Sequence, residues 1–146
     1  MKSLLKTMLL AFAMITSSAT TIQAQTVAGV LQPDPESLDF STSVGVPVSQ
    51  VVEFSVLNQD FISRLTSPLL EAKITGANSN QFAVDSNNIS VFDILASVLN
   101  GNPVDVEVTY NPTSTGTHFG ILVLKLPDIL GIGVTLATVE LTGIAH

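Results

Sequence analysis

Residues 104–110 read Val-Asp-Val-Glu-Val-Thr-Tyr, so an apolar side chain stands at every second position. This period of two is typical of a β-strand that has one buried face and one face in water. The same alternation occurs in residues 52–56, Val-Glu-Phe-Ser-Val, and in residues 137–142, Ala-Thr-Val-Glu-Leu-Thr. These stretches predict half-buried strands, which are a feature of antiparallel sheets.

The sequence outward from these stretches divides into further short strand candidates. Residues 119–126 are apolar on both faces, and we expect Leu122 and Leu124 in the core. Clusters of Gly, Pro, Asn and Asp separate the candidates. The pattern predicts an all-β fold, an immunoglobulin-like antiparallel β-sandwich over residues 36–146. Its seven expected strands lie at residues 37–46, 49–57, 70–75, 82–92, 104–110, 118–126 and 135–143.

The first 24 residues have the features of a secretory signal peptide. Lys2 and Lys6 precede an apolar run over residues 8–15, and small polar residues follow. We expect cleavage after Ala24, with Ala19 as the competing site. An uncleaved membrane anchor is disfavoured, because the run of eight residues is far shorter than the roughly 20 that a spanning helix needs. The mature chain is therefore expected in the periplasm, at the cell surface or outside the cell.

Residues 25–35 follow the signal peptide as an extended lead-in to the sandwich. We expect Pro33 and Pro35 to prevent regular strand pairing there, because proline has no N–H to donate to a ladder.

Charge and composition exclude several classes of function. The chain has 146 residues, 5 basic and 12 acidic side chains, and no cysteine. Loss of residues 1–24 removes two of the five basic residues and none of the 12 acidic ones, which leaves a net charge of −9. A nucleic-acid partner is not expected, because it requires a basic face. Anionic lipid is disfavoured for the same reason, and no membrane span remains after cleavage.

Four short motifs occur in the order and spacing of a known family. The chain resembles the ASH or Hydin-like immunoglobulin-type domain, which is related to major sperm protein and is found in bacteria as a choice-of-anchor module. Ser41 and the Asn58-Gln59-Asp60 turn depart from its pattern. The resemblance implies a structural or interaction module with no catalytic residues. The motifs are Leu38-Asp39-Phe40-Ser41, Ile74-Thr75-Gly76 ahead of Phe82-Ala83-Val84, Tyr110-Asn111-Pro112-Thr113 through Gly116, and Val139-Glu140-Leu141-Thr142-Gly143.

The residues themselves indicate no catalytic or metal site. His118 is expected to be an exposed residue at the start of a strand, without a nucleophile motif nearby. Asp34, Glu36 and Asp39 lack the glycine-assisted turn of a calcium loop. Asp105 and Glu107 share a strand face and are expected to act as solubilising charges. We therefore expect neither an enzyme nor a cofactor.

Three connections between the expected strands are unusually apolar. Strand direction alternates along an antiparallel sandwich, so the second, fourth and sixth connections meet at one end. Asp93 and Asp60 are candidate N-caps for short helical turns over residues 94–99 and 61–65. The apolar side chains either plug the open end of the sandwich or form a contact surface. They are Phe61, Ile62, Leu65, Ile94, Leu95, Val98, Leu99, Ile129, Leu130 and Ile132.

The sequence thus predicts an exported, non-catalytic binding or assembly module. Its partner would be a protein or a cell-surface component that contacts the apolar loop end. A self-assembling fimbrial or matrix-type subunit is one alternative, with residues 26–35 or an edge strand pairing with a neighbour. A secreted enzyme of unknown class is the other alternative.

Overall fold

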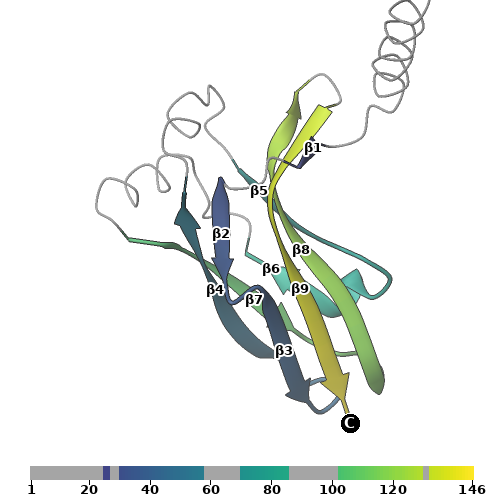
Figure 1. Cartoon of the computed structure of the whole chain (residues 1–146). Helices are drawn as coiled ribbons and strands as arrows, with labels where there is room; N and C mark the ends of the chain where they lie inside the picture. The colour runs from purple at the N-terminus through teal and green to yellow at the C-terminus, as the bar shows by residue number, and fades with distance from the viewer. Residues whose placement is uncertain (1–24, 27–29, 58–69, 86–101, 130–131) are drawn as a thin grey trace, which may run out of the picture.

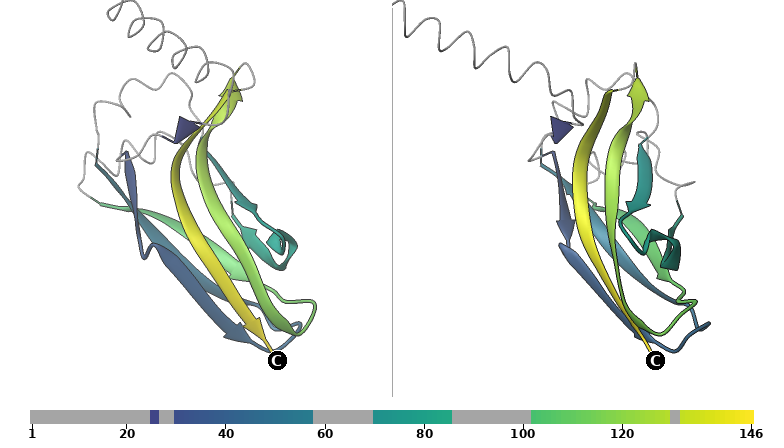
Figure 2. Two further views of the ribbon diagram at one scale, coloured as in Figure 1. Left: turned by 45° about the vertical axis from the view of Figure 1, so that its right-hand side comes forward. Right: turned by 90° about the vertical axis from the view of Figure 1, so that its right-hand side faces the viewer.

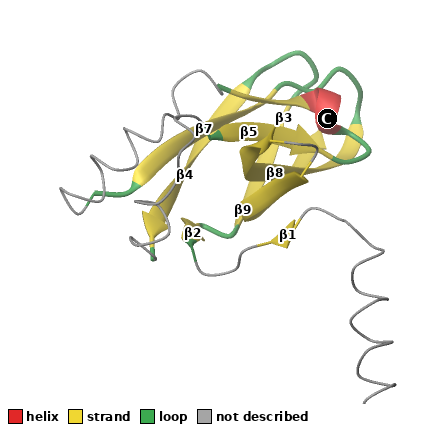
Figure 3. Ribbon diagram, turned by 90° about the horizontal axis from the view of Figure 1, so that it is seen from above, coloured by secondary structure: helices red, strands yellow, loops and turns green. Residues whose placement is uncertain are grey.

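The computed structural model describes residues 25–26, 30–57, 70–85, 102–129 and 132–146 (Figure 1). These residues form strands almost throughout, apart from one 3-10 turn, η1, that is drawn in red in Figure 3. The elements are β1 Gln25–Thr26, β2 Leu31–Asp34, β3 Ser37–Thr42, β4 Val48–Val56, β5 Glu71–Thr75, η1 Ser79–Gln81, β6 Phe82–Val84, β7 Val104–Tyr110, β8 Gly116–Ile129 and β9 Ile132–Ala145.

The strands form two sheets that face each other (Figure 2). The four-stranded sheet has the order β2-β4-β7-β6. The five-stranded sheet has the order β1-β9-β8-β5, and β3 also pairs with β9. An immunoglobulin sandwich places its strands A, B, E and D in one sheet and C, F and G in the other. The two orders reproduce this arrangement, with β2, β4, β7 and β6 as A, B, E and D, which confirms the immunoglobulin-like fold.

The N-terminal segment pairs more than the sequence predicts. β2 runs antiparallel to β4, with Pro33 opposite Phe54, and β1 pairs with β9. The expectation that prolines prevent pairing here was wrong, because β2 is an edge strand and Pro33 needs no donor on its free side. After the cis bond between Asp34 and Pro35 the chain crosses to the other sheet as β3.

The hairpin of β8 and β9 is longer than predicted. Its ladder extends to Ile129 opposite Ile132, whereas the sequence pattern predicted a loop between residues 126 and 135. The ladder continues past two register shifts, and Pro127 lies within the second of them, where a strand tolerates proline. The predicted strand 82–92 is described only as β6 and Asp85. The helical turns predicted over residues 61–65 and 94–99 lie outside the described residues.

The core lies between the sheets and follows the alternation of the strands. In β7 every apolar residue from Val104 to Tyr110 is buried, and in β4 the same holds for Val52 and Phe54. Leu122 and Leu124 are fully buried, as expected. Near the C-terminal end of β9 the core is aromatic, since the rings of Phe40, Phe82 and Tyr110 contact one another.

The turn from β7 to β8 is fixed from two sides. Tyr110 is fully buried at the end of β7, as the sequence predicted. The buried Gln81 accepts a hydrogen bond of 2.7 Å from the Thr113 N–H, and the Gln81 carbonyl accepts one of 2.8 Å from the Asn111 N–H. The Pro112 carbonyl accepts a bond of 2.8 Å from the Gly45 N–H. Neighbouring turns thus hold the Pro112 turn in place.

Replacing Gly116 by valine is expected to destabilise the fold by about 1 kcal/mol or more. Gly116 has φ +118°, and a Cβ atom there would meet nothing within 4 Å, so the cost is backbone strain and not a clash. Chemical denaturation measures the change. Thr117→Val, at the next exposed position of β8, is the control and should stay within about 0.5 kcal/mol. Equal effects for both variants would contradict the prediction.

Candidate functional site

The apolar loop end was expected from alternating strand direction, and the described strand ends agree with it. The ends of β4 and β6 and the starts of β5 and β7 border the undescribed segments 58–69 and 86–101. The registers place these ends on the same side, together with the tip of the β8–β9 hairpin, away from the C-terminus (Figure 1). These strand ends therefore meet at one end of the sandwich, as the alternating strand direction predicted.

The residues assigned to that end are mostly not described. Ile129 and Ile132 lie opposite each other in the last pair of the β8–β9 ladder, so they belong to strands and not to the loop that was expected. The remaining predicted contact residues lie outside the described residues, namely Phe61, Ile62, Leu65, Ile94, Leu95, Val98, Leu99 and Leu130.

The five-stranded sheet exposes large apolar side chains on its outer face. Phe119 is 58% exposed, Ile144 47% and Ile121 41%. Phe119 and Ile121 are next neighbours on one face of β8. Thr142 stands opposite Phe119, so Ile144 is the diagonal neighbour of Phe119 across the β8–β9 pair. These residues form a continuous stripe, which we call the β8–β9 stripe.

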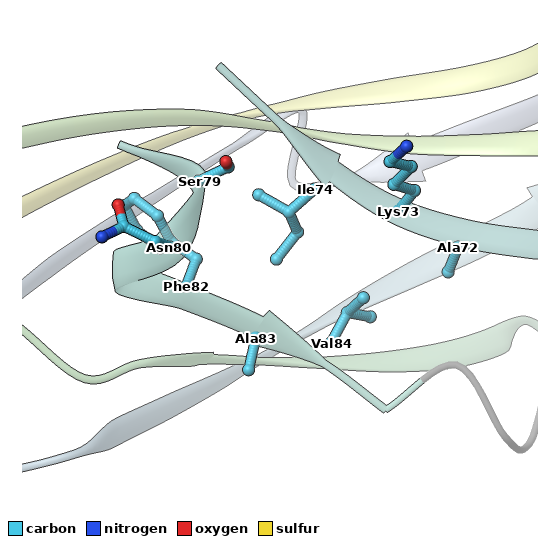
Figure 4. A pocket seen from close by; sticks show the side chains of 8 residues that line it. All are labelled: Ala72, Lys73, Ile74, Ser79, Asn80, Phe82, Ala83 and Val84. Atoms are coloured by element: carbon cyan, nitrogen blue, oxygen red, sulfur yellow. The ribbon is translucent and has the colours of Figure 1, made fainter. Parts of the chain in front are cut away.

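A groove of about 370 Å³ opens at the side of the sandwich, between the edge strands β5 and β6 (Figure 4). β5 ends the five-stranded sheet and β6 ends the four-stranded sheet. Apolar side chains from both strands line it, and polar side chains from β5 and η1 stand at its border. The lining residues are Ala72, Lys73, Ile74, Ser79, Asn80, Phe82, Ala83 and Val84.

His118 is buried, and the expectation of an exposed strand-end residue was wrong. It shares the inward-facing positions of β8 with Gly120 and Leu122, so it points into the sandwich. Its Nδ1 atom lies 2.6 Å from the Tyr110 hydroxyl, and its Nε2 atom lies 3.1 Å from the Ser114 hydroxyl. Both ring nitrogens are therefore used in joining the end of β7 to the turn that follows it.

This network lacks the third member that a serine nucleophile needs. In a catalytic triad a carboxylate orients the histidine and stabilises its positive charge. Here Tyr110 occupies that place, and burial raises the pKa of its phenol, so the neutral form is favoured. His118 therefore connects the buried phenol of Tyr110 to the turn at Ser114.

We expect alkaline conditions to destabilise the protein through Tyr110. Because the pKa of Tyr110 is raised above the ordinary value of 10.0 in the folded protein, its phenol ionises at a lower pH in the unfolded chain than in the folded protein. The stability contributed by the neutral phenol is thus complete below pH 10 and is lost as the pH rises toward the folded-state pKa. Tyr110 is the single tyrosine, so phenolate absorbance reports on it alone. Between pH 8 and pH 11 the melting temperature should fall less for Tyr110→Phe than for the wild type. An equal fall for both proteins would contradict the prediction.

A row of carboxylates crosses the outer face of the four-stranded sheet. Asp34 lies opposite Glu53, and Glu53 lies opposite Asp105, and all three side chains are exposed. Like charges directly opposite each other destabilise a sheet slightly. Among the described residues no three His, Asp or Glu side chains are grouped so that they could hold a metal ion.

Comparisons with known proteins find similar solved structures. No family model and no curated protein matches the chain. Among solved structures it is similar to the ASH/PapD-like domain of human CEP192 (PapD-like domain 7). The TM-score is 0.45 and the identity 12%, over 81% of this chain and 86% of that one. The fold assignment rests on the strand order given above. Within the described ranges no helix is both long and apolar enough to span a bilayer.

Proposed function

We propose that this chain is an exported, non-catalytic binding or assembly module that contacts a protein or a cell-surface component. The observation that carries the proposal is the exposure of Phe119, Ile121 and Ile144 on one sheet face. The aromatic and aliphatic core is complete without these side chains, so packing does not account for them. Exposed apolar patches on soluble proteins commonly mark contact sites.

The four motifs shared with ASH or Hydin-like domains support a role of this kind, because those domains serve as structural or interaction modules. Within that group we place the chain with the bacterial choice-of-anchor modules. The apolar loop end is the second contact region that we propose, through the residues named above from Phe61 to Ile132.

Aspartate substitutions in both regions test the proposal. Phe119→Asp should abolish capture of the partner while leaving the melting temperature unchanged, because Phe119 is exposed. Ser49→Asp, at an exposed position of β4 in the other sheet, is the control and should retain capture. Leu95→Asp and Leu130→Asp should also abolish capture if the loop end is a contact surface. A lower melting temperature for these two variants would instead identify the loop end as a plug of the sandwich.

Export is tested by the intact mass of the secreted product. We propose that the mature chain begins at Gln25, and a mass that retains residues 1–24 would refute this.

A self-assembling subunit remains the alternative function, and one observation favours it. Among the residues that the structure describes, β5 and β6 each have no strand on one side, and such edges can accept a strand from a neighbour. Residues 31–34 are already paired with β4 in their own chain, so the edge strands are the better candidates for a contact between copies. A subunit that polymerises should grow in size with concentration in sedimentation velocity.

A further inference from the structure

The edge strand β5 has a sequence that is complementary to itself. Residues 70–74 read Leu-Glu-Ala-Lys-Ile, so Glu71 and Lys73 stand on the outer face of the sheet, and Ala72 is buried on the inner face. Among the described strands, β5 pairs with β8 and with no other. Within the described part of the chain, its second edge is unpaired and has the geometry to accept a further strand.

Glu71 and Lys73 stand opposite chemically different residues of β8. Glu71 lies opposite Lys125, and the carboxylate and ammonium groups are 3.4 Å apart. Lys73 lies opposite Val123, an apolar residue, so its row holds no carboxylate on the β8 side. A strand added to the free edge of β5 would satisfy Lys73 if it placed an acidic residue beside it.

A second copy of β5 meets this requirement. In an antiparallel pair with Ala72 opposite the partner's Ala72, Glu71 faces the partner's Lys73 and Lys73 faces the partner's Glu71. On the inner face, Leu70 faces the partner's Ile74, and Ile74 faces the partner's Leu70. Opposite charges and apolar pairs at directly opposed positions both stabilise a sheet.

We propose that two copies of this protein associate through antiparallel pairing of their β5 strands about a two-fold axis. The five-stranded sheets then join into one continuous sheet. Across the junction the outer face carries Lys125, Glu71 and the partner's Lys73 in one row, so the charges alternate in sign. The two-fold axis makes the contact closed, and both free β5 edges disappear.

The groove beside β5 agrees with this pairing. Ile74 is only partly buried and lines the groove together with Phe82 and Val84. In the dimer the partner's Leu70 lies beside Ile74, which removes apolar surface from water. This proposal concerns β5 alone and does not depend on the β8–β9 stripe or on the loop end.

Charge variants and their mixture test the pairing by sedimentation velocity of the exported protein over a concentration series. Lys73→Glu places acid against acid, and Glu71→Lys places base against base, so each should weaken association by about tenfold or more. An equimolar mixture of the two variants should restore it, because every charge then faces its opposite on the other chain. Glu140→Lys, on the same outer face but on β9, changes the net charge like Glu71→Lys and should have no effect.

Each result bears on the proposal. A concentration-dependent dimer that both variants weaken and the mixture restores is the expected result. Three results would overturn it: a monomer at every concentration, a dimer that the charge variants do not weaken, or growth beyond two copies. The last would favour the polymerising subunit. Capture of the partner by Phe119→Asp is measured separately, so failure of the proposed function and failure of this dimer are distinguishable.

Discussion

Gly143→Ala is expected to destabilise the protein by about 3 kcal/mol, at the upper end of the range for an overpacked core. A Cβ atom at this position would lie 2.8 Å from Cε1 of Tyr110 and would also overlap Cε2 and Cζ of the same ring. Tyr110 is fully buried and in contact with the rings of Phe40 and Phe82, so it has no free space to move into. Urea denaturation, followed by circular dichroism, measures the loss.

A smaller residue at position 110 should remove most of this penalty. We expect Gly143→Ala to cost much less in a Tyr110→Leu background than in the wild type, and a double-mutant cycle measures the difference. Gly120→Ala is the matched control, because its nearest contact would be the edge of Phe82 at 3.2 Å. It should cost less than Gly143→Ala. Additive effects in the cycle would show that the clash is not with Tyr110.

Tyr110→Ala should cost about 3–5 kcal/mol, as removal of a buried aromatic ring does. The ring fills the space between Phe40, Phe82 and Gly143, and its hydroxyl bonds Nδ1 of His118. A loss of this size is a large share of the stability of an ordinary domain, so the melting temperature of Tyr110→Ala should lie far below that of the wild type.

Tyr110→Phe separates the hydroxyl from the ring. It keeps the packing but leaves the buried His118 nitrogen without its partner, so we expect a loss of about 1–3 kcal/mol. Adding His118→Leu removes both polar partners and should cost little more. If Tyr110→Phe is neutral, the Tyr110–His118 bond contributes nothing to stability. If Tyr110→Ala lowers the free energy of unfolding no more than Tyr110→Phe does, the packing of the ring does not stabilise this end of the core.

The period of two in the sequence was sufficient to predict the strands and the face of each strand that is buried. Val104 to Tyr110 and the pair Leu122 and Leu124 lie where the alternation placed them. The number of these strands and the turns between them were sufficient to predict a β-sandwich. This works because a strand that buries every second side chain needs a second sheet to cover that face.

The candidate contact sites were less accessible to sequence reasoning. Phe119 is exposed, and His118 is buried although it was expected to be an exposed residue at the start of a strand. The alternation of the strand could have revealed the burial of His118, because it shares even-numbered positions with Leu122 and therefore lies on the same face. Gln81 was missed altogether, because its side chain bonds a turn that is 32 residues away in the sequence.

The sequence by itself determined which segments are strands, which face of each is apolar and that the strand from Val104 ends at Tyr110. Those properties depend on neighbours within a few residues. Only the tertiary structure decided that β2 pairs with β4 despite Pro33, that Gly143 makes room for Tyr110 and that Lys73 faces Val123. Each of these depends on register between strands far apart in the chain. Register is set by how the two sheets pack as a whole, because local sequence cannot specify which distant residue stands opposite.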